Sequence, residues 1–238
     1  MDKEVLVGRE TELRIIDRLM DKKCNFVIFG EEGVGKSAIL RRALAERGSS
    51  FQLFSSSSMT LKESLVNFIL FGQNGKNDIS GKNILSLKRI FYPLLKRNPE
   101  YIIFDQLGRV GPKFCSFFEY LLDKEIPLLI VSRGLRDDSI GHLHMLLFNF
   151  EKVEIANLDK ENTIALVEQY VNEYKLNLRR QDDFAMEIFH FSKGNPRVIK
   201  ELCSLARDGK YRKDGHVDVN LMNLDRRIQE LPLSDVGA

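Results

Sequence analysis

Uninterrupted apolar runs alternate with segments of helical periodicity over the first two thirds of the chain. A run of four to eight apolar residues between polar or turn-forming residues is typical of a strand buried on both faces. Such runs lie at residues 25–30, 50–55, 101–105, 127–132 and 152–158. Strands of this kind, separated by helices, indicate a parallel sheet covered on both faces. We therefore predict an α/β fold with a five-stranded parallel sheet.

Helices are predicted where apolar residues recur every three or four positions. In residues 10–21, one helical face collects Leu13, Ile16, Leu19 and Met20. Further helices are predicted at 36–48, from an N-cap at Ser58 or Thr60 to Phe71, and at 84–97. Because proline lacks the N–H that a helix interior needs, we expect the last of these helices to bend or restart at Pro93.

The pattern changes near Asp159. Three helical segments follow at 159–175, 181–192 and 196–208, and "VNLMNLDRRIQEL" predicts a final helix. No strand-like run lies between them. The sequence thus predicts an α/β domain at 1–158 and a small all-α domain at 159–238 with a polar C-terminal tail.

Composition and charge exclude a membrane-spanning protein but few other classes of protein. The chain of 238 residues is 43% hydrophobic and 29% charged, with a formal net charge of +2. No apolar run approaches the roughly 18 to 20 residues of a membrane-spanning helix. The first residues lack the layout of a signal peptide. Three widely spaced cysteines lack metal-binding spacing, so we expect reduced thiols and a cytoplasmic protein.

The segment "GEEGVGKS" between the first strand and its helix predicts a phosphate-binding loop. It fits G-x-x-x-x-G-K-[ST], in which glycines let backbone N–H groups point inward and the helix adds its positive dipole end. The expected nucleotide contacts are Gly30, Glu31, Glu32, Gly33, Val34, Gly35, Lys36, Ser37 and Ala38. Lys36 supplies a cation for the β- and γ-phosphates, and Ser37 supplies a hydroxyl for Mg²⁺.

A second strand offers the carboxylate that such a site needs for Mg²⁺. In "YIIFDQLG" the strand leads to Asp105, the predicted metal ligand beside Ser37. Many enzymes of this type have a glutamate as general base at the next position, where this chain has Gln106. An amide accepts no proton at neutral pH but orients water. The sequence predicts binding of ATP with slow or assisted hydrolysis, and leaves open whether Gln106 is natural or an introduced ATP trap.

Taken together, these motifs resemble a AAA+ type ATPase of the ASCE class of P-loop proteins. Within AAA+ they are most similar to the branch of the STAND switch ATPases, the archaeal ATPases and the origin-recognition initiators. Three further segments carry the resemblance, which covers residues 5 to about 208: "VLVGRE" at 5–10, "PLLIVSRG" at 127–134 and "FSKGNPRVIKEL" at 191–202.

The resemblance implies roles for residues outside the loop. It places Val7, Gly8 and Arg9 beside the adenine and ribose, and Pro196 against the base. It makes Ser132 and Arg133 the γ-phosphate sensors at the end of a strand, and Arg197 a second sensor from a helical lid. The expected catalytic residues are therefore Lys36, Asp105, Gln106, Ser132, Arg133 and Arg197.

Two functions of different class follow from the resemblance. The first is an ATP·Mg²⁺-dependent switch that closes its lid and assembles with itself or with a protein partner in trans. The second is a DNA-handling ATPase of the initiator, helicase-loader or transposition-regulator type. The basic cluster Arg207, Lys210, Arg212 and Lys213 is a candidate DNA contact, and a solvated loop is the alternative. A metabolic kinase is a third hypothesis, but the sequence has no evident motif that would bind the acceptor of the phosphoryl group.

Overall fold

The computed structural model describes residues 6–48, 51–73, 79–213 and 216–230. They divide into two compact units. The sheet unit comprises residues 9–32 and 36–155, and the helical unit comprises residues 6–8, 33–35 and 156 onward. Each unit is described by itself.

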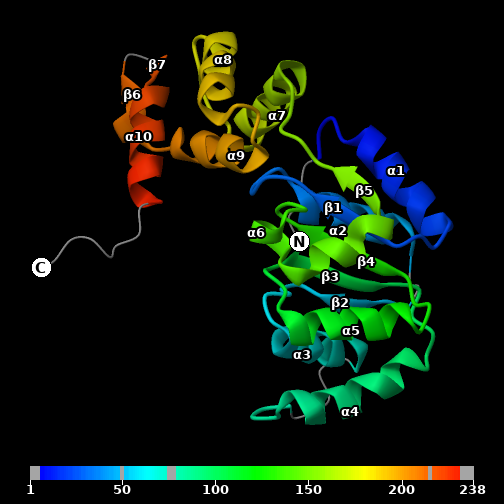
Figure 1. Ribbon diagram of the computed structural model, residues 1–238. Coiled ribbons are helices and arrows are strands. Elements are labelled where there is room, and N and C mark those ends of the chain that lie inside the picture. The colour runs from blue at the N-terminus through cyan, green and yellow to red at the C-terminus, as the bar shows by residue number, and fades with distance from the viewer. Residues whose placement is uncertain (1–5, 49–50, 74–78, 214–215, 231–238) are drawn as a thin grey trace, which may run out of the picture. The chain divides into compact units, whose positions relative to one another are not determined.

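The sheet unit is built on five parallel strands in the order β2-β3-β4-β1-β5 (Figure 1). Their bounds are β1 Phe26–Phe29, β2 Leu53–Ser55, β3 Ile102–Leu107, β4 Leu128–Ser132 and β5 Glu151–Glu154. The predicted five-stranded parallel sheet is confirmed. Three strands differ from the prediction: β2 begins at Leu53, β3 continues two residues past Asp105, and β5 ends at Glu154 rather than at residue 158.

Helices and short turns connect these strands. They are α1 Glu10–Asp21, α2 Lys36–Glu46, α3 Leu61–Gly72, α4 Ile84–Leu95, α5 Pro112–Leu122, α6 Asp137–Ile140 and the 3₁₀ helix η1 His142–Asn149. The predicted N-cap of α3 is Thr60, whose hydroxyl accepts from the N–H of Glu63. Helix α4 is one element through Pro93, which lies in its last turn, so of the two predicted alternatives, a bend or a restart, the restart is wrong.

Alternation along the strands fills both faces of the sheet. Val27, Ile102, Phe104 and Ile130 pack in the cluster formed with α3, α4, α5 and η1. The intervening strand residues, such as Ile28 and Ile103, are equally buried and so belong to the opposite face. Helix α2 buries Ile39, Leu40 and Ala43, none of which belongs to the cluster formed with α3, α4, α5 and η1, and α1 packs against α2.

The aromatic helix α5 belongs to the core formed with α3, α4 and η1. On α5, Phe114, Phe117 and Phe118 are buried. Phe104 of β3 lies 4.5 Å from Phe118 and 5.0 Å from Phe68, measured between ring centroids. These contacts anchor β3, the strand that carries Asp105, to the helical layer.

The helical unit consists mainly of α7 Lys160–Glu173, α8 Gln181–Ser192, α9 Pro196–Leu205 and α10 Val219–Gln229. A 3₁₀ turn, η2 Gly209–Tyr211, leads into the antiparallel strands β6 Arg212–Lys213 and β7 His216–Val217. The unit is helical as predicted, with this small two-stranded sheet as an addition that the all-α prediction lacked. The predicted polar tail after α10 lies outside the described residues.

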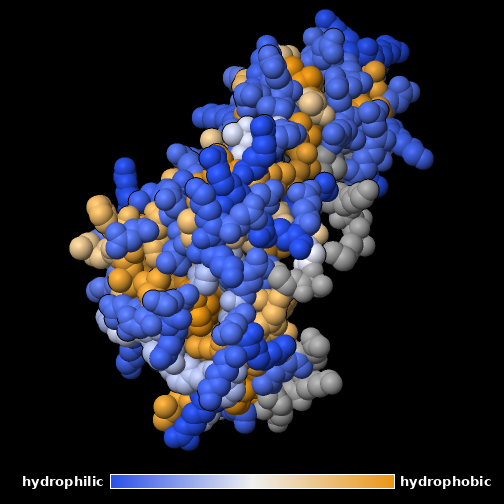
Figure 2. Space-filling view, turned by 90° about the vertical axis from the view of Figure 1, so that its right-hand side faces the viewer, coloured by the Kyte–Doolittle hydropathy of each residue, from blue (hydrophilic) through white to orange (hydrophobic). Residues whose placement is uncertain are grey.

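The described surface is mainly hydrophilic on the side that Figure 2 displays. Large exposed apolar side chains include Met145 and Phe148 on η1, and Leu224 and Ile228 on α10. Within the described ranges, no helix has both the length and the apolar composition needed to cross a membrane.

Candidate nucleotide site

The phosphate loop, residues 30–37, runs from the end of β1 into the first turn of α2. Gly33 and Gly35 have φ angles of 84° and 96°, a backbone conformation that L side chains rarely adopt. A Cβ added to Gly35 would meet nothing within 4 Å, so the requirement there is one of backbone conformation rather than of space. The loop therefore has the backbone that the sequence motif predicts, followed by a helix whose dipole favours an anion.

Lys36 is folded back on this loop. Its Nζ donates to the carbonyl oxygens of Gly30 and Glu31, each at 2.7 Å. Burial lowers the pKa of the ammonium group, and the nearby Arg133 guanidinium lowers it further. The protonated form of Lys36 is thus destabilised in this site, and a bound phosphate anion would stabilise it.

Ser37 and Asp105 meet as the sequence predicts. The Ser37 hydroxyl donates to Asp105 Oδ1 at 2.9 Å, across 68 positions of sequence. Asp105 is 2% exposed. Burial raises the pKa of its carboxyl group, while the hydrogen bonds from Ser37 and from the N–H of Gln106 oppose the rise.

These two side chains fit a magnesium ion. Mg²⁺ prefers oxygen ligands and is usually held by one or two protein groups plus substrate phosphates. A hydroxyl and a buried carboxylate beside a phosphate loop form such a donor set. In the part of the chain that the structure describes, no group of three or more His, Cys, Asp or Glu side chains gathers as a metal site of its own.

Gln106 lies at an irregularity of β3 that the sequence did not predict. The register with β4 shifts between Phe104 and Leu107. Gln106 has a φ of 50°, unusual for a non-glycine residue, and its side chain is exposed. The bulge turns its N–H onto Asp105 Oδ1 at 2.9 Å. Asp105 is consequently an interior residue of the strand rather than its last.

Ser132 and Arg133 stand at the end of β4, beside the loop. Ser132 pairs in register with Phe29 of β1 and with Leu107 of β3. It is buried, and its hydroxyl donates to the carbonyl of Gly134 at 2.9 Å. Arg133 forms an ion pair with Glu32 of the phosphate loop at 2.6 Å. The carboxyl ends of β1, β3 and β4 thus bring Lys36, Asp105 and Arg133 to one edge of the sheet.

The N-terminal residues Val7, Gly8 and Arg9 have structural contacts of their own. Val7 packs against the apolar cluster of the helical unit, and Gly8 lies against the side chain of Asn162 in α7. Arg9 is buried and forms an ion pair with Glu12 at 2.9 Å. Their contact with adenine and ribose stays a prediction.

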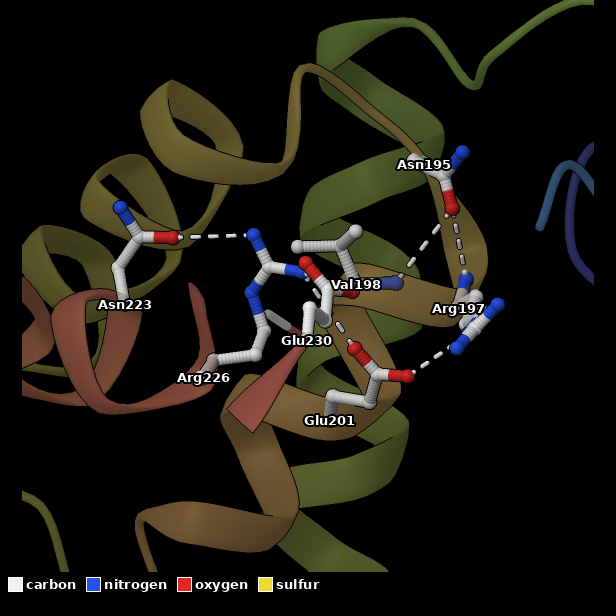
Figure 3. A network of polar contacts seen from close by, with 7 residues as sticks. All are labelled: Asn195, Arg197, Val198, Glu201, Asn223, Arg226 and Glu230. Atoms are coloured by element: carbon white, nitrogen blue, oxygen red, sulfur yellow. Dashed lines mark hydrogen bonds and ion pairs between the residues drawn. The ribbon is translucent and has the colours of Figure 1, made fainter. Parts of the chain in front are cut away.

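Pro196 and Arg197 open α9. Proline occupies the first turn, and the Asn195 side chain caps the helix by accepting from the N–H groups of Arg197 and Val198. Arg197 Nε donates to Glu201 Oε1 at 2.8 Å. Figure 3 shows Arg226 of α10 on the other side of Glu201, at 3.7 Å from its Oε2 atom.

Sequence reasoning missed the acidic partners of both sensor candidates. Glu201 follows Arg197 by four residues, the spacing at which helical side chains meet, so its pairing was accessible from the sequence. Glu32 lies about 100 positions before Arg133, and no local pattern indicates that pair.

The basic cluster proposed as a DNA contact or a solvated loop is largely folded. Tyr211 is buried, and its hydroxyl donates to Asp225 Oδ2 at 2.8 Å. Lys210 pairs with the same carboxylate at 3.1 Å, and Arg212 donates to the carbonyl of Ala206. The solvated-loop interpretation is therefore wrong for Arg212, which together with Tyr211 ties this turn to α9 and α10.

Comparison with known proteins supports the class of fold. No protein-family model matches the chain, and no curated protein matches its sequence. Solved structures do match, and they confirm the fold that the sequence resemblance implied, an α/β unit with a five-stranded parallel sheet and a helical unit. The likeness at this level of identity concerns the fold.

Three similar structures illustrate the likeness of fold. The ORC1 protein of Aeropyrum pernix, solved in complex with DNA, has a TM-score of 0.65 and 15% identity, over 96% of this chain and 70% of that one. The replication initiator DnaA, bound to AMPPCP and single-stranded DNA, has a TM-score of 0.58 and 16% identity, over 95% and 66%. A STAND protein of Pyrococcus horikoshii with a tetratricopeptide repeat sensor has a TM-score of 0.52 and 19% identity, over 96% and 33%.

Proposed function

We propose that this chain is an ATP-dependent molecular switch that binds ATP with Mg²⁺ and hydrolyses it slowly or with assistance. The observation that carries the proposal is the 2.9 Å hydrogen bond from Ser37, the last residue of the phosphate loop, to the buried Asp105 of β3. Together with Lys36 and the N-terminus of α2, that pair provides the groups that bind a nucleoside triphosphate with its metal ion: a hydroxyl, a carboxylate, an ammonium group and a helix dipole.

The side chains have distinct roles in this proposal. Lys36 exchanges its bonds to the carbonyls of Gly30 and Glu31 for bonds to the β- and γ-phosphates. Ser37 and Asp105 hold Mg²⁺, which neutralises phosphate charge when bound. Ser132 and Arg133 lie at the adjacent strand end and are proposed to contact the terminal phosphate.

Gln106 makes the hydrolytic step slow. Its amide orients a water molecule but takes no proton, so the general base that accelerates such reactions by roughly 10² to 10⁴ is missing at that position. A site of this kind dwells in its triphosphate state. Arg197 is proposed to sense the same phosphate, so that the helical unit closes as a lid and the closed form assembles with itself or with a protein partner.

The test is nucleotide binding by the intact chain and by Lys36→Ala. Removal of the ammonium group takes away charge-assisted hydrogen bonds to two phosphates, so we expect ATP affinity to fall roughly 100-fold. The measurement is titration calorimetry with ATP and Mg²⁺. Lys124→Ala is a matched control, because Lys124 is exposed and precedes the amino end of β4, at the opposite edge of the sheet. Equal affinity of the two variants would refute the site.

A second candidate function is a DNA-handling ATPase. It is favoured by the likeness of the fold to ORC1 solved with DNA and to DnaA solved with single-stranded DNA. Its test is retention of the chain on duplex and single-stranded DNA with ATP and Mg²⁺ at stepped salt concentrations. Binding that weakens steeply with salt is expected of phosphate contacts, and no retention at low salt would exclude this function.

A further inference from the structure

Glu32 and Arg133 form a contact that the proposed switch does not by itself require. Glu32 belongs to the phosphate loop and Arg133 follows β4, and their ion pair measures 2.6 Å. The two side chains are 54% and 73% exposed. Arg133, the candidate phosphate sensor at the end of β4, is therefore paired with a carboxylate of the phosphate loop itself.

The same two charges act on Lys36. After burial, the largest influence that lowers the pKa of Lys36 is the Arg133 guanidinium, whereas Glu32 and Asp105 act in the opposite direction. Three side chains thus lie within electrostatic reach of one another: two cations suited to phosphate and one anion that competes with it.

We propose that Glu32 competes with the terminal phosphate of a nucleoside triphosphate for Arg133, and so limits how strongly the site distinguishes a triphosphate from a diphosphate. A bound triphosphate offers Arg133 an anion of higher charge than a carboxylate, so the guanidinium changes partner. A diphosphate has no γ-phosphate, so Arg133 stays on Glu32. The inference rests on the proposed function and adds a specificity-determining residue to it.

Exposure determines the size of the effect. Ion pairs between exposed side chains are weak because water screens them, so the exchange biases the site without locking it. We expect the loss of the Glu32 charge to raise the ratio of ATP to ADP affinity about two- to fivefold. Salt should reduce the effect for the same reason.

The experiment measures dissociation constants for ATP and ADP, with Mg²⁺, on the full chain and four variants. Glu32→Gln removes the competing anion. Glu31→Gln removes the same charge one residue earlier in the loop, and so measures the general effect of charge on both nucleotides. Arg133→Gln and the double variant Glu32→Gln/Arg133→Gln complete a cycle that isolates the pair. Circular dichroism checks that each variant is folded.

The expected result is a higher ATP-to-ADP affinity ratio in Glu32→Gln than in Glu31→Gln, with no such gain once Arg133 is replaced. Equal ratios in Glu32→Gln and Glu31→Gln would overturn this inference alone, provided that the unmodified chain binds ATP. A gain that persists without Arg133 would also overturn it, because repulsion from Glu32 would then suffice. Failure of the unmodified chain to bind either nucleotide would overturn the proposed function together with this inference.

Discussion

Asp105 illustrates, at the scale of a single residue, how a site for a cation weakens the fold that carries it. Its carboxylate is 2% exposed and receives hydrogen bonds of 2.9 Å from Ser37 and from the N–H of Gln106. Burial nevertheless raises its pKa. A folded-state pKa above the unfolded value means that stability is lost as pH rises from about 4 through the folded pKa. At neutral pH the ionised group therefore costs stability unless a cation is bound.

Replacing this carboxylate by an amide should stabilise the chain. Asn keeps an acceptor oxygen for Ser37 but carries no buried charge. We expect Asp105→Asn, without Mg²⁺ or nucleotide, to unfold about 2–4 °C higher at pH 7, the shift of a gain near 1 kcal/mol in a chain of this size. Below pH 4 the gain should vanish, because the native carboxyl group is then protonated. Differential scanning calorimetry at both pH values measures it.

The matched control for this prediction is Asp123→Asn, an exposed residue after α5 whose replacement should shift the unfolding temperature little. Stabilisation by Mg²⁺ and ATP should be lost in Asp105→Asn alone. An unfolding temperature that falls at pH 7, or a gain of equal size at pH 4, would show that the carboxylate is not strained by its burial.

Gln106 gives the second prediction at this scale. If its amide occupies the place of the usual base, Gln106→Glu should raise the rate of phosphate release by a factor of roughly 10² or more, as expected of a general base. Gln106→Asn, which keeps an amide and suits the left-handed backbone of this position, is the control and should leave the rate low. Release is followed with a coupled phosphate assay. No gain with glutamate would assign the positioning of water to another residue or to a partner.

How far a residue could be predicted from the sequence depended on how local its cause is. Ser37 and Asp105 were predicted as ligands of one magnesium ion from two sequence motifs, and the structure brings the two side chains together. The left-handed backbone of Gln106 was not predicted, because a glutamine shows no preference for that conformation and the bulge arises from pairing with β4. The pair of Glu32 and Arg133 likewise depends on tertiary structure.

At the scale of elements, the start of α9 shows a motif fixed by packing. Gly194 has a φ of 79°, and a Cβ there would lie 1.9 Å from the carbonyl oxygen of Leu158. The Leu158 N–H donates to the Gly194 carbonyl at 2.9 Å, so the two segments lie in close contact. Asn195 then caps the helix and Pro196 begins it. Local structure thus requires most of "GNPR", whatever the nucleotide does there.

A side chain at Gly194 should therefore disrupt the helical unit. Gly194→Ala combines a left-handed backbone with a clash against main-chain atoms that cannot swing away. We expect a loss of about 3 kcal/mol and an unfolding temperature lower by roughly 6–12 °C. Thermal unfolding followed by circular dichroism measures it. Gly209→Ala is the control in the same unit, because a Cβ at Gly209 meets nothing within 4 Å. Equal effects of the two changes would contradict the packing argument.

Element boundaries were predictable where a cap marks them. Thr60 begins α3 as its side chain indicates, and α9 starts at Pro196. Boundaries without a capping residue were less predictable from the sequence. The two residues added to β3 pair with β4 through a bulge, and the short β6–β7 sheet has no apolar alternation to reveal it. Pairing between strands is a tertiary effect, which local periodicity does not contain.

At the scale of the whole molecule, the fold does not by itself specify a biological role. The likeness extends over 95–96% of the chain for the ORC1 protein, the replication initiator DnaA and the STAND protein alike. Shared folds carry different functions, so the role must follow from what the ATP-bound chain contacts. Exposed apolar side chains in both units supply candidate surfaces, among them Phe148 at 80% and Ile228 at 56% exposure.

Assembly in response to ATP is the last prediction and the one that separates a switch from a simple ATP-binding domain. A ligand shifts an equilibrium between states only by its difference in affinity for them, so an oligomer should form with ATP·Mg²⁺ and not with ADP. Multi-angle light scattering measures the mass in solution without nucleotide, with ADP and with ATP·Mg²⁺, while phosphate release is followed in the same samples. Lys36→Ala should remain at the mass of the nucleotide-free chain in all three. Growth only with ATP, with little phosphate released, supports a switch held by Gln106. An equal mass with ATP and with ADP would contradict self-assembly by the terminal phosphate and would direct the search to a partner of the ATP-bound form.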